Sequence, residues 1–342
     1  MKINLASFRL PKYIILIMIM LATMLLCICA GSVNIPLKDT LIAIWHSILR
    51  IPIPEGVSKS IIVFVRLPRV LCVALVGASL SLCGGAMQGL LRNPLADGST
   101  LGVSSWASLG AVLAIAFGVS FPGISFAGTM IMAVLFAFLS LIIILGLAYK
   151  LDKSLSTNTI ILIGVIFTMF AHSIISLIIT FAGNKMKSIM YWTMGSLAGS
   201  NYTNVLTMFF ALLVFGTLII RYSNELNAFA IGEENARHVG VHVKKVKLTI
   251  MIAVSALIGV SVSIGGTIGF VGLVIPHMTR MLVGPNHKRL LPAVIVSGAT
   301  FLMLTDLLSR VLLKPLELPI GVVTSFIGSI VFIYIFYSSR KV

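Results

Sequence analysis

Residues 156–181 read STNTIILIGVIFTMFAHSIISLIITF and contain no Asp, Glu, Lys or Arg. About 20 predominantly apolar residues in a helix are enough to cross the hydrocarbon core of a bilayer. Outward from this stretch, similar apolar segments recur between charges and Pro or Gly clusters. With it they make ten expected spans: 12–31, 60–91, 102–119, 124–148, 156–181, 202–220, 246–267, 270–283, 290–311 and 320–338. The pattern predicts an all-α polytopic membrane protein with one transmembrane domain over residues 1–342.

The composition excludes a soluble enzyme that carries a membrane anchor. Hydrophobic residues make up 58% of the chain and charged residues 10%, whereas soluble domains average about 25% charged residues. The net charge of +16 would suggest nucleic acid for a soluble protein. In a membrane protein, basic residues instead collect on cytoplasmic loops, and no basic run with interleaved aromatic residues occurs here. We therefore expect no nucleic-acid partner.

The distribution of basic residues predicts the orientation. If the N-terminus lies in the cytoplasm, the inner segments hold 16 of the 25 Lys and Arg residues and the outer segments hold the other 9. This bias predicts that both termini are cytoplasmic. The outer basic residues are clustered rather than scattered.

Small residues recur in two clusters, at 77–89 and 259–269, which predict close helix packing. The eighth expected span is too short to cross alone and is interrupted by Gly269, Gly272 and Pro276. Five positions also recur at an offset of 182 residues, which is either chance or an inverted repeat of the kind found in transporters. They are Gly77, Ser79, Ser81, Gly84 and Pro94, matched by Gly259, Ser261, Ser263, Gly266 and Pro276.

No catalytic constellation, metal site or cofactor motif is evident, so we predict no enzyme activity and no cofactor. A phosphate-binding loop of the form G-x-x-x-x-G-K-[ST] is absent, so any ATP hydrolysis must take place in another subunit. Asp306 is the only acid well inside a span, and Arg310 follows one turn later, which predicts an ion pair within that helix. A proton-coupled secondary transporter would need more carboxylates inside the membrane.

One polar stripe runs along the expected helix 156–181. Its members lie four residues apart, so they share one helix face: Gly164, Thr168, His172, Ser176 and Thr180. Ser and Thr can bond back to their own helix, whereas an ionisable residue inside a membrane usually faces a cavity or an interface. The stripe therefore predicts a translocation pathway, with simple packing as the alternative.

Six motifs, in order along the chain, carry a family resemblance. They are RLPR (66–69), QGLLRNPLAD (88–97), LGVS (101–104), GFVGLVIPH (269–277), DLLSR (306–310) and ELPIGVVT (317–324). Together they resemble the FecCD-type permeases of binding-protein-dependent ABC importers for iron–siderophores, haem and vitamin B12. The resemblance covers residues from about 60 to the C-terminus and implies the same ten-span fold in a bacterial cytoplasmic membrane.

The resemblance also implies partners: two copies of a cytoplasmic ATP-binding subunit, an external substrate-binding protein and a second permease subunit in a homo- or heterodimer. It places the ATPase-coupling loop at about 226–247, with Gly232, Glu233, Ala236, Arg237 and Gly240. The loop's own residues suit a short helix with acids at its N-terminus and Gly240 as its stop. A plain solvated loop is the alternative.

At the outer mouth the resemblance implies that arginines grip glutamates of the binding protein. Arg66 and Arg310 stand at the matching motif positions, and Arg69 follows Arg66 by one turn. Guanidinium groups suit carboxylate partners; anchoring to lipid headgroups is the alternative. The predicted function is import of a metal chelate by alternating access, with a ferric siderophore as first candidate, haem or vitamin B12 as alternatives, and a secondary transporter as the candidate from another class.

Overall fold

The computed structural model describes residues 10–31, 35–49, 51, 60–98, 101–119, 127–153 and 156–339, so the two ends of the predicted domain lie outside the described part. These residues form helices and one isolated bridge between Leu313 and Leu316. The longer helices are α1 (Leu10–Cys29), α2 (Leu37–Leu49), α3 (Leu67–Leu90), α4 (Val103–Phe117), α5 (Ala127–Leu151), α6 (Thr157–Phe181), α8 (Tyr202–Ala211), α12 (Val243–Gly265), α13 (Val271–Val283), α14 (His287–Val311) and α15 (Ile320–Ser339). The shorter ones are η1 (Ser60–Arg66), η2 (Gly183–Lys185), α7 (Met186–Thr193), η3 (Leu212–Gly216), α9 (Thr217–Arg221), α10 (Ser223–Phe229) and α11 (Glu233–His238).

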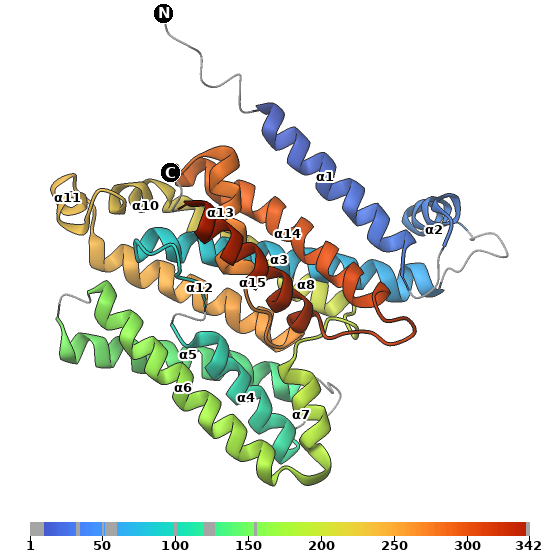
Figure 1. Ribbon diagram of the computed structural model, residues 1–342, viewed down its shortest axis with the longest axis horizontal. Helices are drawn as coiled ribbons and strands as arrows, with labels where there is room; N and C mark the ends of the chain where they lie inside the picture. Colours follow the sequence, from blue (N-terminus) through green and yellow to red (C-terminus); the bar gives the residue numbers. More distant parts are fainter. Residues whose placement is uncertain are drawn as a thin grey trace, which may run out of the picture.

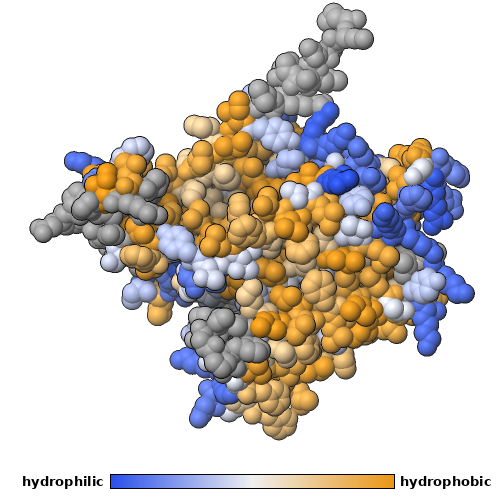
Figure 2. All heavy atoms as spheres, turned by 180° about the vertical axis from the view of Figure 1, so that it is seen from behind, coloured by the Kyte–Doolittle hydropathy of each residue, from blue (hydrophilic) through white to orange (hydrophobic). Residues whose placement is uncertain are grey.

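Each of the ten expected spans corresponds to a helical segment, so the predicted fold class is confirmed. Seven segments of the described chain are long and apolar enough to cross a membrane, while α4, α13 and α15 are the shorter apolar ones. The expected span 102–119 is shorter than predicted, because left-handed glycines bound α4 at Gly102 and Gly118. Apolar side chains cover the broad middle of the molecule and polar ones gather toward its edges (Figure 2), as a surface in contact with lipid requires.

The molecule has two ends, defined here by α11 and α2, which lie at opposite extremes of Figure 1. The start of α1 joins the α11 end, since the Nζ of Lys12 donates to the carbonyl of Leu282 and the hydroxyl of Tyr13 donates to that of Arg289. The end of α15 returns to this side, antiparallel to α14 (Figure 1). Both described termini therefore lie on the side of α11, and the cytoplasmic location of that side stays a prediction.

Glycines let the central helices approach closely, as the small-residue clusters predicted. A Cβ atom on Gly84 would lie 1.8 Å from the carbonyl oxygen of Gly272, so α3 and α13 touch backbone to backbone. A Cβ on Gly77 would lie 2.4 Å from the carbonyl oxygen of Gly298 in α14. Helices α3 and α12 contact each other and run in opposite directions (Figure 1). That direction is what an inverted repeat requires, but the repeat itself stays a prediction.

Candidate functional site: a central cavity, a polar coupling segment and a buried arginine cluster

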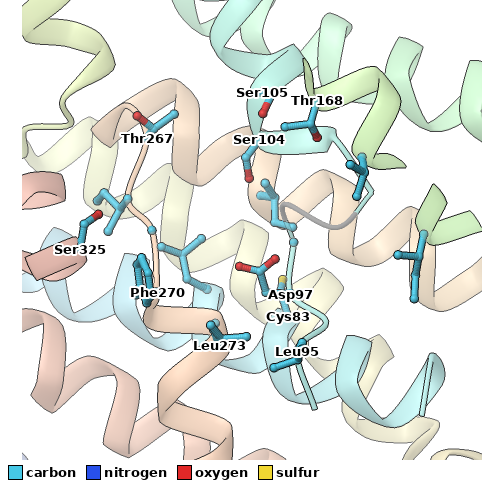
Figure 3. A pocket seen from close by; sticks show the side chains of 18 of the residues that line it. Cys83, Leu95, Asp97, Ser104, Ser105, Thr168, Thr267, Phe270, Leu273 and Ser325 are labelled. Atoms are coloured by element: carbon cyan, nitrogen blue, oxygen red, sulfur yellow. The ribbon is translucent and has the colours of Figure 1, made fainter. Parts of the chain in front are cut away.

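A cavity of about 660 Å³ lies between α3, α4, α6, α12 and the start of α13. Most of its lining is apolar, and the polar groups come from separate segments. In the described chain those polar residues are Asn93, Asp97, Ser104, Ser105, Thr168, His172, Thr267 and Ser325, with the thiol of Cys83 (Figure 3). The lining thus places hydroxyl, amide and carboxylate groups on an otherwise apolar surface, as small-molecule sites generally do.

The cavity contains only part of the predicted polar stripe. Thr168 and His172 line it, and the Nε2 atom of His172 lies 3.3 Å from the hydroxyl of Ser105 in α4. Gly164 packs against the turn before α4, where a Cβ on Gly102 would lie 3.3 Å from its carbonyl oxygen. Ser176 and Thr180 lie outside the lining and donate hydrogen bonds to carbonyls of their own helix. The contacts of Ser176 and Thr180 are therefore those of the alternative interpretation, in which Ser and Thr bond back to their own helix.

Other lining residues were not singled out from the sequence as pathway residues. Asn93 and Asp97 belong to the quoted 88–97 motif, whose polar residues after an apolar helix were a usable signal. Ser325, by contrast, lies one residue beyond the last quoted motif and carries no sequence signal of its own. Ser325 lines the cavity because α15 packs beside α13.

The predicted coupling segment forms α10 and α11 at one extreme of the molecule (Figure 1). Helix α11 begins at Glu233 and ends at His238, and Gly232 and Gly240 flank it with positive φ angles of 109° and 90°. The expected short helix with a glycine stop is therefore present, and Ala236 is its buried residue. Exposed residues in and beside α11 combine charged and apolar side chains: Glu234 and Arg237 within the helix, Ile231 before it and Val239 after it.

Glu233 ties this segment to two membrane helices. One of its carboxylate oxygens lies 2.6 Å from the Nζ of Lys247 in α12, whose side chain is 1% exposed. The same oxygen accepts a 3.5 Å hydrogen bond from the hydroxyl of Thr157, at the start of α6. Helix α6 carries Thr168 and His172, so one carboxylate joins the predicted coupling segment to a helix that lines the cavity. On the other flank, the amide of Asn227 in α10 contacts Asn286 and His287 at the start of α14.

The three predicted docking arginines are inside the molecule, each between 4% and 7% exposed. Arg66 donates to the carbonyls of Ile28 and Cys29, and Arg310 donates to those of Cys27 and Ala30. These four carbonyls end α1 and lack partners in their own helix, so the two guanidinium groups cap it. The sequence led us to expect an exposed mouth at these positions. The arginine side chains instead form hydrogen bonds and ion pairs within the chain, and their docking role stays a prediction.

A buried carboxylate completes the arginine cluster. The Oδ1 atom of Asp306 accepts hydrogen bonds from the Nε and Nη2 atoms of Arg69 at 3.0 and 2.9 Å. Its Oδ2 atom lies 3.0 Å from the Nε of Arg310, which confirms the ion pair expected within this helix. Arg69 also pairs with Glu317 at 2.9 Å.

Comparison with known proteins decides the family. The model of the FecCD transport family matches residues 18–338. The chain belongs to the FecCD transport family. It is therefore a multi-span ABC permease of the bacterial cytoplasmic membrane.

Similar proteins extend over nearly the whole chain. An ABC transporter permease protein of uncharacterised role, YvrB of Bacillus subtilis, is 42% identical over 99% of this chain and 97% of its own length. The molybdate import system permease protein MolB of Haemophilus influenzae is 36% identical over 84% of each chain. A solved structure assigned to the metal-chelate type of ABC transporter, in an inward-facing conformation, has a TM-score of 0.84 at 32% identity and covers 96% of this chain and 99% of its own.

The pairing of Glu233 with Lys247 gives a first prediction for this FecCD-family permease. Glu233→Lys places two cations together and leaves Lys247 buried without its carboxylate. We expect a loss of roughly 1–3 kcal/mol of stability, between the values for exposed and buried ion pairs. The double variant Glu233→Lys/Lys247→Glu restores the pair and should recover most of that loss. Thermal unfolding of the purified proteins measures both changes.

The neighbouring Glu234 supplies the matched control, because it is exposed and forms no ion pair with another described residue. Glu234→Lys should shift the unfolding temperature little. Equal destabilisation by the substitutions at Glu233 and Glu234, or failure of the double variant to recover, would contradict the importance of this pair.

Proposed function

We propose that this permease carries a ferric siderophore through the cavity between α3, α4, α6, α12 and α13. The observation that supports this substrate class is the chemistry of the lining. Among its described residues there is one carboxylate, Asp97, and no Lys or Arg. A bare oxyanion such as molybdate is best held by cationic groups or by clustered N–H donors, whereas a metal chelate presents a bulky, largely organic surface that an apolar wall with scattered hydroxyl groups can accommodate.

The comparisons support the broader class and differ on the substrate. A structure assigned to the metal-chelate type of transporter is similar over 96% of this chain, while MolB is a molybdate permease. Haem and vitamin B12 also present organic surfaces, so they remain the alternatives to a siderophore. Membership in an ABC permease family favours ATP-driven import over secondary transport.

The partners follow from the same class, since ABC importer permeases form dimers and work with an ATPase and a substrate-binding protein. For this chain we propose that α11 contacts the ATPase. The exposed Ile231 and Val239 beside Glu234 and Arg237 support this assignment, because protein interfaces combine apolar anchors with a polar rim. We also propose that the substrate passes between two permease subunits, with the cavity of each subunit facing that pathway, and that the binding protein docks at the α2 end. Direct docking by Arg66, Arg69 and Arg310 would require them to exchange contacts within the chain for glutamates of the partner.

Uptake measurements test the substrate. Cells that express the permease with its ATPase and binding protein are supplied in turn with a radiolabelled ferric siderophore, haem, vitamin B12 and molybdate. We expect uptake of the siderophore, lost on ATP depletion and retained with an uncoupler. Thr168→Trp, which places a large ring in the cavity, should lower the rate of this uptake at least about tenfold. A tenfold decrease corresponds to an increase of about 1.4 kcal/mol in the activation free energy.

Gly146→Trp is the matched control, because nothing lies within 4 Å of the Cβ position of Gly146. It adds the same ring away from the cavity and should leave uptake near that of the unmodified protein. Uptake of molybdate, haem or vitamin B12 in place of the siderophore would overturn the substrate proposal. Siderophore uptake that Thr168→Trp leaves unchanged would overturn the role of the cavity.

A further inference from the structure

Helix α2 presents an apolar stripe that no described part of the chain covers. Leu37, Leu41, Trp45 and Leu49 follow one another at four-residue spacing and are 53%, 48%, 62% and 48% exposed. Each step of four residues turns a helix by only 40°, so the four side chains occupy one face. A soluble helix would turn such a face toward the core.

The opposite face of α2 is the one that packs on the protein. Thr40 and Ala43 are fully buried, and α2 contacts α1 and η1. The hydroxyl of Thr40 lies 3.4 Å from the thiol of Cys29, at the end of α1. Helix α2 is therefore seated on the bundle by its small residues, and its large apolar residues point away from it.

The position of α2 suits the surface of a membrane. It lies at the extreme opposite α11 and is seen nearly along its axis in Figure 1, while the spanning helices run across the picture. It thus lies across the direction of the spans. Helix α1 contacts α2, and near its end it exposes Leu25 and Leu26, so the lipid-facing surface of α1 lies next to α2.

We propose that α2 lies flat in the interfacial layer of the membrane, with Leu37, Leu41, Trp45 and Leu49 inserted at the boundary between headgroups and acyl chains. Helices of this kind bury an apolar face about 5–10 Å into that boundary, and Trp is enriched there because its ring is apolar and its N–H is polar. Asp39 in the first turn and His46 in the last turn lie off this stripe and supply polar groups for the headgroup side. A second copy or a soluble partner is the competing occupant, and continuity with the lipid-facing surface of α1 favours lipid.

This placement has a mechanical consequence for the permease. The same end of α1 is held by α2 through Thr40 and by the guanidinium groups of Arg66 and Arg310. An interfacial α2 therefore fixes the height of the arginine cluster relative to the membrane surface. The inference depends on the membrane location of the chain and not on which substrate it carries.

Fluorescence quenching of Trp45 tests the proposal. The full chain with Trp106→Phe and Trp192→Phe keeps Trp45 alone and is reconstituted in liposomes whose lipids carry bromine either near the headgroup or near the chain end. We expect the lipid brominated near the headgroup to quench at least about twofold more strongly, in line with a shallow position, and aqueous acrylamide to quench weakly.

A second variant separates lipid from other occupants. Leu41→Lys/Leu49→Lys on the same background should raise acrylamide quenching and reduce quenching by the brominated lipids, while the unfolding temperature in detergent stays the same. Strong acrylamide quenching of the parent protein would overturn the proposal in favour of a water-exposed face. Protection from both acrylamide and brominated lipid would overturn it in favour of a protein partner or a second copy.

Discussion

Gly84→Ala is expected to prevent most of this permease from reaching a stable folded state. The added Cβ atom would lie 1.8 Å from the carbonyl oxygen of Gly272 and 2.5 Å from its Cα. Those atoms belong to the backbone of α13, so no side chain can rotate to relieve the overlap. Helices α3 and α13 would have to separate, and overpacking that moves backbone costs typically 1–3 kcal/mol and sometimes more. We expect the upper end of this range or beyond, because α3 also packs tightly on α14 near Gly77.

The amount of monodisperse protein recovered in detergent and its unfolding temperature measure this effect. Gly146→Ala is the matched control, since Gly146 is also a helical glycine but has open space around its Cβ position. It should be neutral or slightly stabilising, because Ala is preferred to Gly inside a helix by up to about 1 kcal/mol. Normal recovery and stability of Gly84→Ala would show that α3 and α13 do not approach as closely as described.

These two glycines show which features of helix packing could be predicted from the sequence. Gly84 belongs to a small-residue cluster, which predicted close packing of its helix. The partner could not be predicted, because Gly272 lies in a short interrupted helix whose place depends on the whole bundle. The spans themselves were predictable, since lipid imposes a minimum length and a near absence of charge on each crossing segment.

The elements missed by the sequence reading are those that do not cross the membrane. Helix α2 has 13 residues, too few to span, and it mixes Lys38, Asp39 and His46 with its apolar residues. Helix α7 has 8 residues and gives no span signal either. Helix α11, by contrast, was predicted, because acids at its start and a following glycine are local signals that act within one turn.

The candidate site was predictable only where one helix supplies it. The spacing of Thr168 and His172 placed both on one face, and both line the cavity. The same spacing continues to Ser176 and Thr180, yet the lining does not include them. The stripe on α6 extends beyond His172, the residue at which Ser105 of α4 makes its contact. The spacing of residues along α6 does not predict where a neighbouring helix packs, so it could not show which part of the stripe lines the cavity.

In the arginine cluster, too, only the contact within one helix could be predicted from the sequence. The pair of Asp306 and Arg310 was predictable, because it lies within one turn of a helix. The bonds from Arg66 and Arg310 to the end of α1 join residues 37 to 283 positions apart in the chain. Their motif positions indicated arginines at an outer mouth, and no local rule indicated that carbonyls of α1 would take up their hydrogen bonds.

Asp306→Asn is the substitution in this cluster with the largest expected effect. Asp306 is one of the two carboxylates that pair with Arg69, and its side chain is 2% exposed. It accepts hydrogen bonds from Arg69 and forms an ion pair with Arg310. Asn keeps one oxygen for Arg69 but turns an uncharged amide, itself a donor, toward a second guanidinium. Breaking a buried ion pair by removing one partner costs about 3–5 kcal/mol, since the remaining charge stays buried without compensation. We therefore expect Asp306→Asn to lower the unfolding temperature strongly and to loosen the end of α1.

Glu317 provides the control, because its side chain pairs with Arg69 as Asp306 does but is 36% exposed. Water can replace a lost partner there, so Glu317→Gln should cost no more than about 1 kcal/mol. Thermal unfolding compares the two variants, and protease cleavage or hydrogen exchange near residues 27–31 reports on the end of α1. If both variants unfold alike, burial does not govern this cluster. If Asp306→Asn loses stability while the end of α1 stays protected, Arg66 alone is sufficient to hold that end, and the link from Asp306 through Arg310 to α1 carries little of the stability.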